Sequence, residues 1–260
     1  MYFTGGEKMQ NLKMVIRYDG THYSGWQKQG NTANTIQGKF EHLIGEITGE
    51  TVSVNGSGRT DAGVHAMGQV ANVKLKGSVD LMELRKDLNY RLPDDIAVLT
   101  IEEVPDRFHA RLNAVRKTYQ YRLYVGETKP VFERRQVTVL KNVSGCTSSI
   151  LNVSDMREAA GYLVGVHDFT SFCGNPSFKK SAVRKVEKLE IIENEDELTI
   201  RITGDGFLQN MVRIITGTLI DVGKGRIRPE EIRVILAAKD RKKAGPTAPA
   251  GGLMLMSVEY

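Results

Sequence analysis

Cysteine is scarce in this chain of 260 residues, which contains only two. Cys146 and Cys173 lie far apart, so they suggest neither a disulfide framework nor a pair of zinc ligands. We expect both to be reduced thiols, the usual state of cysteine in the cytoplasm. The five histidines lack a ligand spacing such as HExxH, so we expect hydrogen-bonded or surface histidines and no metal site.

Long hydrophobic runs are also missing, and the first residues lack a basic-then-apolar signal pattern. These absences argue against a membrane protein and favour a cytoplasmic location. Gly56 and Gly58 could open a dinucleotide-binding fingerprint, but Asp61 replaces the third glycine and no helical pattern follows. With no P-loop either, we expect no cofactor.

The charge balance leaves two classes of partner open. Lys and Arg number 36 against 31 Asp and Glu, a formal net charge of +5. This modest excess permits a polyanionic partner such as RNA, and it fits a mildly basic enzyme of small molecules equally well. Hydrophobic residues make up 40% and charged residues 26%, as in an ordinary globular protein with a sizeable core.

The hydrophobic pattern gives the order β-α-β-β-α-β twice, which predicts an α+β protein of two ferredoxin-like halves with antiparallel-rich sheets. We place the halves at residues 1–110 and 111–260. In the first half we predict strands at 15–18, 51–54, 69–73 and 97–101, a helix capped by Asn34, and a helix at 81–92.

The second half predicts a strand at 117–125, a helix starting at 154–155, and a hairpin of 189–192 with 198–202. A helix at 207–222, a helix after Pro229 and a strand at 253–258 follow. Residues 127–155 contain a strand-like run at 136–140, and we expect this segment to connect the halves.

The segment 56–66 is the most informative of the chain, because it sets one carboxylate, Asp61, among small residues between two predicted strands. It reads Gly-Ser-Gly-Arg-Thr-Asp-Ala-Gly-Val-His-Ala. Gly58 and Gly63 allow a sharp turn and a close approach by a ligand. By itself the loop also fits an ordinary Asx-type turn joining two strands.

Two further residues stand out on physical grounds. Tyr119 shares one face of its predicted strand with Tyr121 and Leu123, which is typical of a core aromatic residue. Arg213 lies on an apolar helix, where Gln209, Arg213 and Thr216 form a narrow polar stripe. An arginine there needs an anionic partner, which any nearby acid could supply.

The segment 56–66 resembles, without a break, the catalytic loop of the tRNA pseudouridine synthase A family (TruA). Other motifs of this family follow in the expected order, so the resemblance runs from about residue 12 to residue 260, with no motif recognised at 1–10 or 127–155. These motifs lie at residues 18–21, 25–27, 107–111, 117–122, 167–172, 209–213 and 245–250, with Leu253.

The resemblance implies an isomerase that converts uridine to pseudouridine at positions 38, 39 and 40 in the anticodon stem-loop of tRNA. It implies a homodimer in which one tRNA touches both subunits, no cofactor, and two α/β halves joined around a central RNA-binding cleft.

The resemblance also assigns roles. Asp61 becomes the catalytic nucleophile and Arg213 its catalytic partner; Tyr119 binds the uracil. Arg59 is expected to contact RNA and fill the gap left by the flipped base, and Leu253 to lie near the base pocket.

Two alternatives stay open. One is a pseudouridine synthase with another RNA target, which mapping of the modified sites would reveal. The other is a catalytically silent RNA-binding module, against which the intact Asp61, Tyr119 and Arg213 argue. The sequence does not determine which uridine is preferred, whether Asp61 attacks ribose C1′ or uracil C6, or which residues form dimer contacts.

Overall fold

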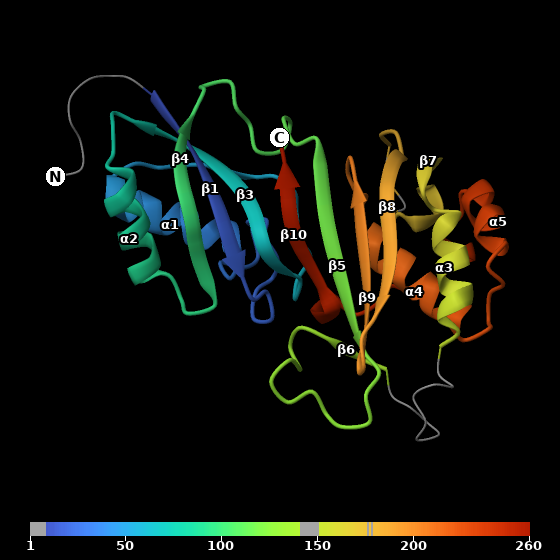
Figure 1. Ribbon diagram of the computed structural model, residues 1–260. Coiled ribbons are helices and arrows are strands. Elements are labelled where there is room, and N and C mark those ends of the chain that lie inside the picture. The colour runs from blue at the N-terminus through green and yellow to red at the C-terminus, as the bar shows by residue number, and fades with distance from the viewer. Residues whose placement is uncertain (1–8, 141–150, 176, 178) are drawn as a thin grey trace. The chain divides into compact units, whose positions relative to one another are not determined.

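A computed structural model describes residues 9–140, 151–175, 177 and 179–260 of the chain (Figure 1). The chain forms two compact units. The first unit runs to Val115 and also takes in Leu255–Tyr260, and the second unit is Arg116–Met254. We predicted halves of 1–110 and 111–260. The end of the chain returns to the first unit because its last strand pairs with a strand of that unit.

The first unit has the predicted order β-α-β-β-α-β. Its sheet has the order β4-β1-β3, with β2 also pairing with β3, and all these pairings are antiparallel. Helices α1 and α2 contact each other, and α2 also contacts β4 (Figure 1). The elements are β1 (Met9–Tyr18), α1 (Ile36–Thr48), β2 (Val54–Gly56), β3 (His65–Lys76), α2 (Leu81–Arg91) and β4 (Ile96–Val104).

The core of the first unit follows the two periodicities of the sequence. Every second residue of β1 from Leu12 to Ile16 is completely buried, and α1 buries every fourth residue from Ile36 to Ile44. Burial of each such side chain stabilises the fold by about 1.5–3 kcal/mol. The sheet and α1 therefore supply a firm base for the loops at their ends.

Several predicted boundaries in this unit differ from the structure. The strand predicted at 15–18 begins at Met9, and the strand predicted at 69–73 is His65–Lys76. The strand predicted at 51–54 lies at Val54–Gly56. The cap of α1 is Thr35 and not Asn34, because the Thr35 side chain accepts the Gly38 N–H while the Asn34 amide donates to the His22 carbonyl.

The second unit contains an antiparallel sheet in the order β5-β9-β8-β7, with β6 parallel to β5. Helix α3 contacts both α4 and β8 (Figure 1). The elements are β5 (Arg116–Tyr124), β6 (Thr138–Val139), α3 (Val153–Gly161), β7 (Gly165–Asp168), η2 (Thr170–Phe172), β8 (Val183–Glu193), β9 (Glu197–Gly204), α4 (Met211–Gly223), α5 (Glu231–Ala238), η3 (Arg241–Lys243) and η4 (Ala250–Gly252); β10 (Leu253–Glu259) begins here and ends in the first unit.

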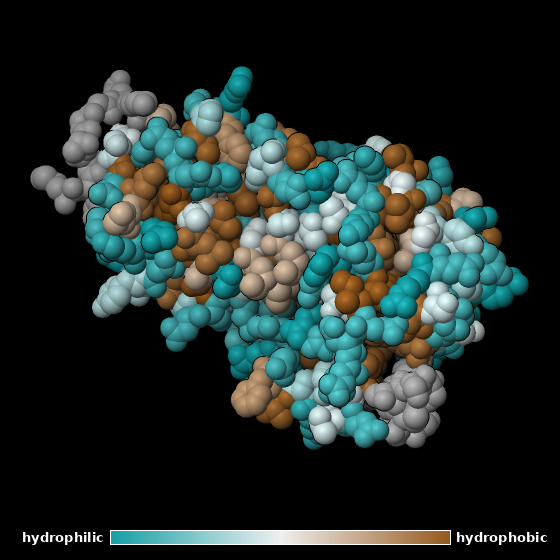
Figure 2. Space-filling view, viewed as in Figure 1, coloured by the Kyte–Doolittle hydropathy of each residue, from teal (hydrophilic) through white to brown (hydrophobic). Residues whose placement is uncertain are grey.

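We had expected residues 127–155 to connect the two halves. The described residues of this segment instead lie within the second unit, where the short strand β6 pairs with β5. The loop between β5 and β6 also exposes apolar side chains at Val131 and Phe132, and brown atoms mark this loop in Figure 2. Residues 141–150, including Cys146, lie outside the described residues.

Helix α4 is shorter than predicted and begins at Met211. Asn210 has a φ of 60°, in the left-handed region, so the helix cannot extend backward through it. Gln209 is therefore outside the helix, and the predicted polar stripe of Gln209, Arg213 and Thr216 does not form. The hairpin of β8 and β9, in contrast, lies where it was predicted.

Two predicted absences can be compared with the described residues. No helix among them is both long enough and apolar enough to cross a membrane. Cys173 is buried, with a free thiol.

A buried amide pair ties β1 to β3 and to the chain beyond β4. Asn72 donates to the Asn11 side-chain oxygen at 3.0 Å and accepts the Ala110 N–H at 2.9 Å. The Asn11 amide in turn donates to the Phe108 carbonyl at 2.9 Å. This pair satisfies backbone groups that no sheet partner reaches.

We predict that Asn72→Ala lowers the free energy of unfolding by about 2–4 kcal/mol, because it leaves two buried polar groups without partners. Urea denaturation would measure the loss. The control is Asn113→Ala, which removes a comparable bond to the His109 N–H at an exposed position and should cost much less. Equal losses in the two variants would contradict the prediction.

Candidate active site

Asp61 lies in a tight turn between β2 and β3. The Asp61 carbonyl accepts the Val64 N–H at 3.1 Å, and Gly63 has a φ of 79°. Positive φ at this position of a turn is natural for glycine and strained for other residues. The predicted turn is thus present, closed by the backbone, and it holds the half-buried Asp61 at its first position.

The residue before Asp61 is fixed by the segment that follows β1. The Trp26 N–H donates to the Thr60 carbonyl at 3.0 Å. Gly25 has a φ of 95°, and a Cβ atom there would lie 2.6 Å from the Thr60 oxygen. Glycine is therefore required at position 25, because only its backbone fits so close to the loop.

The entry to the loop is held by a buried glutamine of β3. Ser57 donates its hydroxyl to the Gln69 Oε1 at 2.6 Å, and Gln69 Nε2 donates to the Gly58 carbonyl at 3.1 Å. The Ser57 N–H donates to the Val70 carbonyl at 2.7 Å. Ser57 and Gln69 are fully buried, so water does not compete for these bonds.

The exit from the loop is held by His65, which is almost completely buried. Its Nδ1 lies 3.1 Å from the Gly20 nitrogen and 3.0 Å from Asp19 Oδ1. The same Asp19 oxygen accepts the Thr21 N–H at 2.9 Å. As expected, His65 is a hydrogen-bonded histidine, and it joins the turn after β1 to the end of the loop.

Tyr18 forms a buried hydrogen bond to the loop. Its hydroxyl lies 2.8 Å from Thr60 Oγ1, and both residues are buried. Burial raises the pKa of Tyr18 to about 12, although its hydrogen bonds to Thr60 and Gln69 act in the opposite direction. The phenol therefore stays neutral near pH 7 and serves as a fixed hydrogen-bonding partner.

Arg59 is an exposed residue of the loop. Its Nε donates to Gln27 Oε1 at 3.2 Å. Gln27 belongs to the segment 25–27, which sequence analysis recognised without assigning it a role. The side chains that hold the loop, including Tyr18, Gln27 and Gln69, were missed as site residues because their hydrogen-bond partners are brought together only in the folded chain.

The other predicted site residues lie in the second unit. Tyr119 is on β5 and largely buried, and its ring meets the Phe207 ring edge-on at 5.2 Å between centroids. Tyr121 and Leu123 are buried on the same strand, as predicted. Leu253 is also buried, at the start of β10.

Arg213 lies in the first turn of α4 and is half-buried. Its Nε donates to the Ala248 carbonyl at 2.7 Å, and its Nη1 to the Asn210 side-chain oxygen at 3.0 Å. The Arg213 carbonyl also accepts the Ala248 N–H at 3.1 Å. The segment 245–250 thus orients the guanidinium, and the expected pairing of Arg213 with Asp61 stays a prediction.

A hollow of about 1020 Å³ lies in the first unit, away from this loop. Neither Asp61 nor Arg59 lines it, and its charges are mixed, with Lys28, Lys39, Glu46 and Glu50 among the lining residues. None of the residues 56–66 lines the hollow, so we describe the loop as the candidate site. Among the described residues, no group of three His, Cys, Asp or Glu side chains could hold a metal ion.

Comparisons with known proteins identify the family of the chain. A family model described as tRNA pseudouridine synthase matches residues 14–113 and 159–260. A protein of Bacillus anthracis named tRNA pseudouridine synthase A 2 is 46% identical over 253 residues, which cover 97% of this chain and 100% of that protein. A tRNA pseudouridine synthase A of Thermoanaerobacter sp. (strain X514) is 45% identical over 252 residues, with the same coverage of both chains.

A solved structure of a Cbf5-Nop10-Gar1 complex gives a TM-score of 0.36 at 11% identity, over 94% of this chain and 48% of that one, a likeness too weak to carry an argument. The family match and the relatives define the class: the chain belongs to the tRNA pseudouridine synthase family.

We predict that Tyr18→Phe lowers the free energy of unfolding by about 1–2 kcal/mol, since Thr60 Oγ1 loses a buried hydrogen bond. Because Thr60 precedes Asp61, turnover at a temperature where the variant is folded should also fall. Tyr23→Phe is the matched control: that tyrosine is buried too, and its hydroxyl bonds Asp95. Thermal melting and a single-turnover assay would compare the Tyr18→Phe and Tyr23→Phe variants. A Tyr18 variant with wild-type turnover would contradict a role in holding the loop.

Proposed function

We propose that the protein isomerises uridine to pseudouridine at positions 38, 39 and 40 of the tRNA anticodon stem-loop, with Asp61 as nucleophile. One observation carries the proposal: a half-buried carboxylate stands in a turn held on both sides by buried hydrogen bonds, inside the stretch that the family model matches. A nucleophile held in place before the substrate arrives does not have to be ordered during the reaction.

The reaction requires no outside oxidant, reductant or group donor. The bond from uracil N1 to ribose C1′ breaks, the base turns, a new bond forms from C5 to C1′, and the C5 proton is lost while N1 gains one. A carboxylate suits this chemistry because it can form a covalent adduct that holds the intermediate. The target nucleotide must first leave its stack so that Asp61 can reach it.

The remaining residues take their proposed roles around this step. Arg213 pairs with Asp61 and holds its carboxylate in line, Tyr119 stacks on the uracil, and Leu253 lines the base pocket. Arg59 fills the space that the flipped base leaves. We further propose that the protein acts in the cytoplasm as a homodimer.

We predict that Asp61→Asn abolishes pseudouridine formation and leaves tRNA affinity within several-fold, because the change keeps the shape and removes the nucleophile. The measurement is release of the C5 hydrogen from tRNA labelled at that position, together with mapping of the modified sites. Asp106→Asn, at an exposed position, is the control. Substantial turnover by the Asp61 variant would refute the assignment, and modification only at other uridines would refute the proposed target.

We also expect tRNA affinity to fall steeply with salt, because neutralised phosphates release counterions. Charge reversal of the exposed Lys179 and Lys180, or Lys242 and Lys243, should flatten the slope of log affinity against log salt by about 0.7–0.9 for each lost phosphate contact. Reversal of Lys86, which already pairs with Glu83, should change it less. Salt-independent affinity would contradict binding through phosphate contacts.

A further inference from the structure

We infer that Gln27 and Gln37 are positioning residues that hold the Arg59 guanidinium ready for the space vacated by the flipped base. The inference rests on the role proposed above for Arg59. The observation behind it is a chain of hydrogen bonds between side-chain amides, which begins at backbone groups of the first unit and ends at Arg59 Nε.

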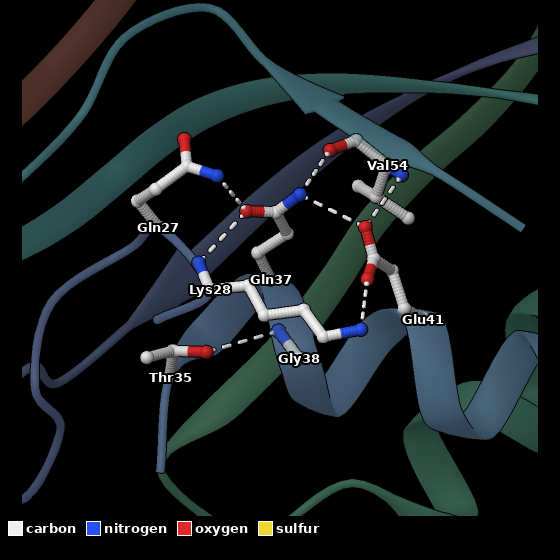
Figure 3. Close-up of polar contacts among 7 residues, drawn as sticks. All are labelled: Gln27, Lys28, Thr35, Gln37, Gly38, Glu41 and Val54. Atoms are coloured by element: carbon white, nitrogen blue, oxygen red, sulfur yellow. Dashed lines mark hydrogen bonds and ion pairs between the residues drawn. The ribbon is translucent and has the colours of Figure 1, made fainter. Parts of the chain in front are cut away.

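Gln37 is the fixed point of this chain. Its Oε1 accepts from Gln27 Nε2 at 2.7 Å and from the Lys28 N–H at 2.9 Å (Figure 3). Its Nε2 donates to Glu41 Oε1 at 2.8 Å and to the Val54 carbonyl at 3.1 Å. Two acceptor positions and two N–H groups are all that a side-chain amide offers, so Gln37 is saturated.

The orientation of the Gln37 amide is unique. A backbone N–H can only donate and a backbone carbonyl can only accept, so Lys28 and Val54 decide which end is oxygen. The residue is 8% exposed, and water therefore offers little alternative. Glu41 strengthens the arrangement, because its Oε1 also accepts the Val54 N–H at 3.1 Å and its Oε2 pairs with Lys28 Nζ at 3.1 Å (Figure 3).

The orientation of the Gln37 amide determines the orientation of the Gln27 amide. Because Gln37 presents an oxygen, Gln27 must turn its Nε2 toward it, and its Oε1 then faces Arg59 Nε at 3.2 Å. A flipped Gln27 amide would set N–H against N–H at Arg59 and oxygen against oxygen at Gln37. The acceptor that Arg59 meets is therefore determined by backbone groups at Lys28 and Val54.

The hydrogen bond from Arg59 Nε to Gln27 restrains a side chain that is otherwise flexible. Arg59 is exposed, and its long side chain would sample many rotamers without a partner. The bond from Nε restrains the guanidinium at one edge of its plane and does not use the four N–H hydrogens of the two terminal NH₂ groups. A planar group with such donors suits a space between stacked bases, where it can stack and hydrogen-bond.

A double-mutant cycle of Arg59→Ala, Gln27→Met and the combined variant tests the inference. The measurement is the single-turnover rate of C5 hydrogen release at saturating enzyme, with tRNA affinity and melting temperature measured alongside. Gln27→Met keeps the length and loses the acceptor, so we expect a rate about ten-fold lower in the wild-type background. In the Arg59→Ala background the same change should lower the rate less than about two-fold, since interacting residues are not additive.

Two further variants separate positioning from a general structural effect. Gln29→Met removes an amide that bonds the Ser24 carbonyl, in the same segment and at an exposed position, and should leave the rate unchanged. Gln27→Asn keeps both amide groups on a shorter side chain that cannot reach Gln37 and Arg59 together, so it should behave like Gln27→Met. It also replaces Gln27→Met if that variant does not fold.

The outcomes separate the inference from the proposed function. An Arg59→Ala variant with the wild-type rate would overturn the role of Arg59 itself. A slow Arg59→Ala variant, combined with equal effects of Gln27→Met in both backgrounds, would overturn the positioning chain and leave the role of Arg59 intact. A Gln27→Met variant that loses tRNA affinity rather than rate would also count against the chain, because positioning acts after the tRNA has bound.

Discussion

The backbone of Gly25 and Trp26 is the constraint on which the loop depends, because it bonds two elements at once. On one side the carbonyls of Gly25 and Trp26 accept the N–H groups of Ile36 and Gln37, at 3.2 and 2.9 Å. On the other side the Trp26 N–H donates to the Thr60 carbonyl. The first N–H groups of a helix need partners outside it, and here those partners also fix the residue before Asp61.

The loop around Asp61 inherits its rigidity from this arrangement. Gln69 bonds its entry, His65 its exit and Tyr18 its centre, and all three are almost completely buried. Buried hydrogen bonds of this kind are strong because water does not compete for them. In a family whose members isomerise a nucleotide, such a scaffold would keep the nucleophile placed while the RNA rearranges.

In the second unit, hydrogen bonds to the segment 245–250 hold Arg213 in place. Arg213 is held through both its backbone and its side chain by Ala248, and the Gly245 N–H donates to Thr218 one turn further along α4 at 2.9 Å. Tyr121 bonds the Pro249 carbonyl at 2.8 Å, so β5 supports the same segment. A segment distant in sequence thus sets the direction of an arginine on a helix, and the helical pattern alone did not predict these contacts.

Sequence by itself determined the order of elements in the first unit and located the turn that contains Asp61. Burial is periodic along each strand and helix, so β1, α1, the β8–β9 hairpin and the turn at Asp61 could be located from local patterns of residues such as Ile36 and Phe40. Only the tertiary structure decided the cap at Thr35, the start of α4 at Met211, the place of 127–140 and 151–155 in the second unit, and the return of β10 to β3. Each of these features depends on contacts between residues distant in sequence or on one backbone angle. Neither produces a periodic pattern in the sequence. The same reason hid the amide chain from Gln37 to Arg59, since a glutamine shows its partners only when the chain is folded.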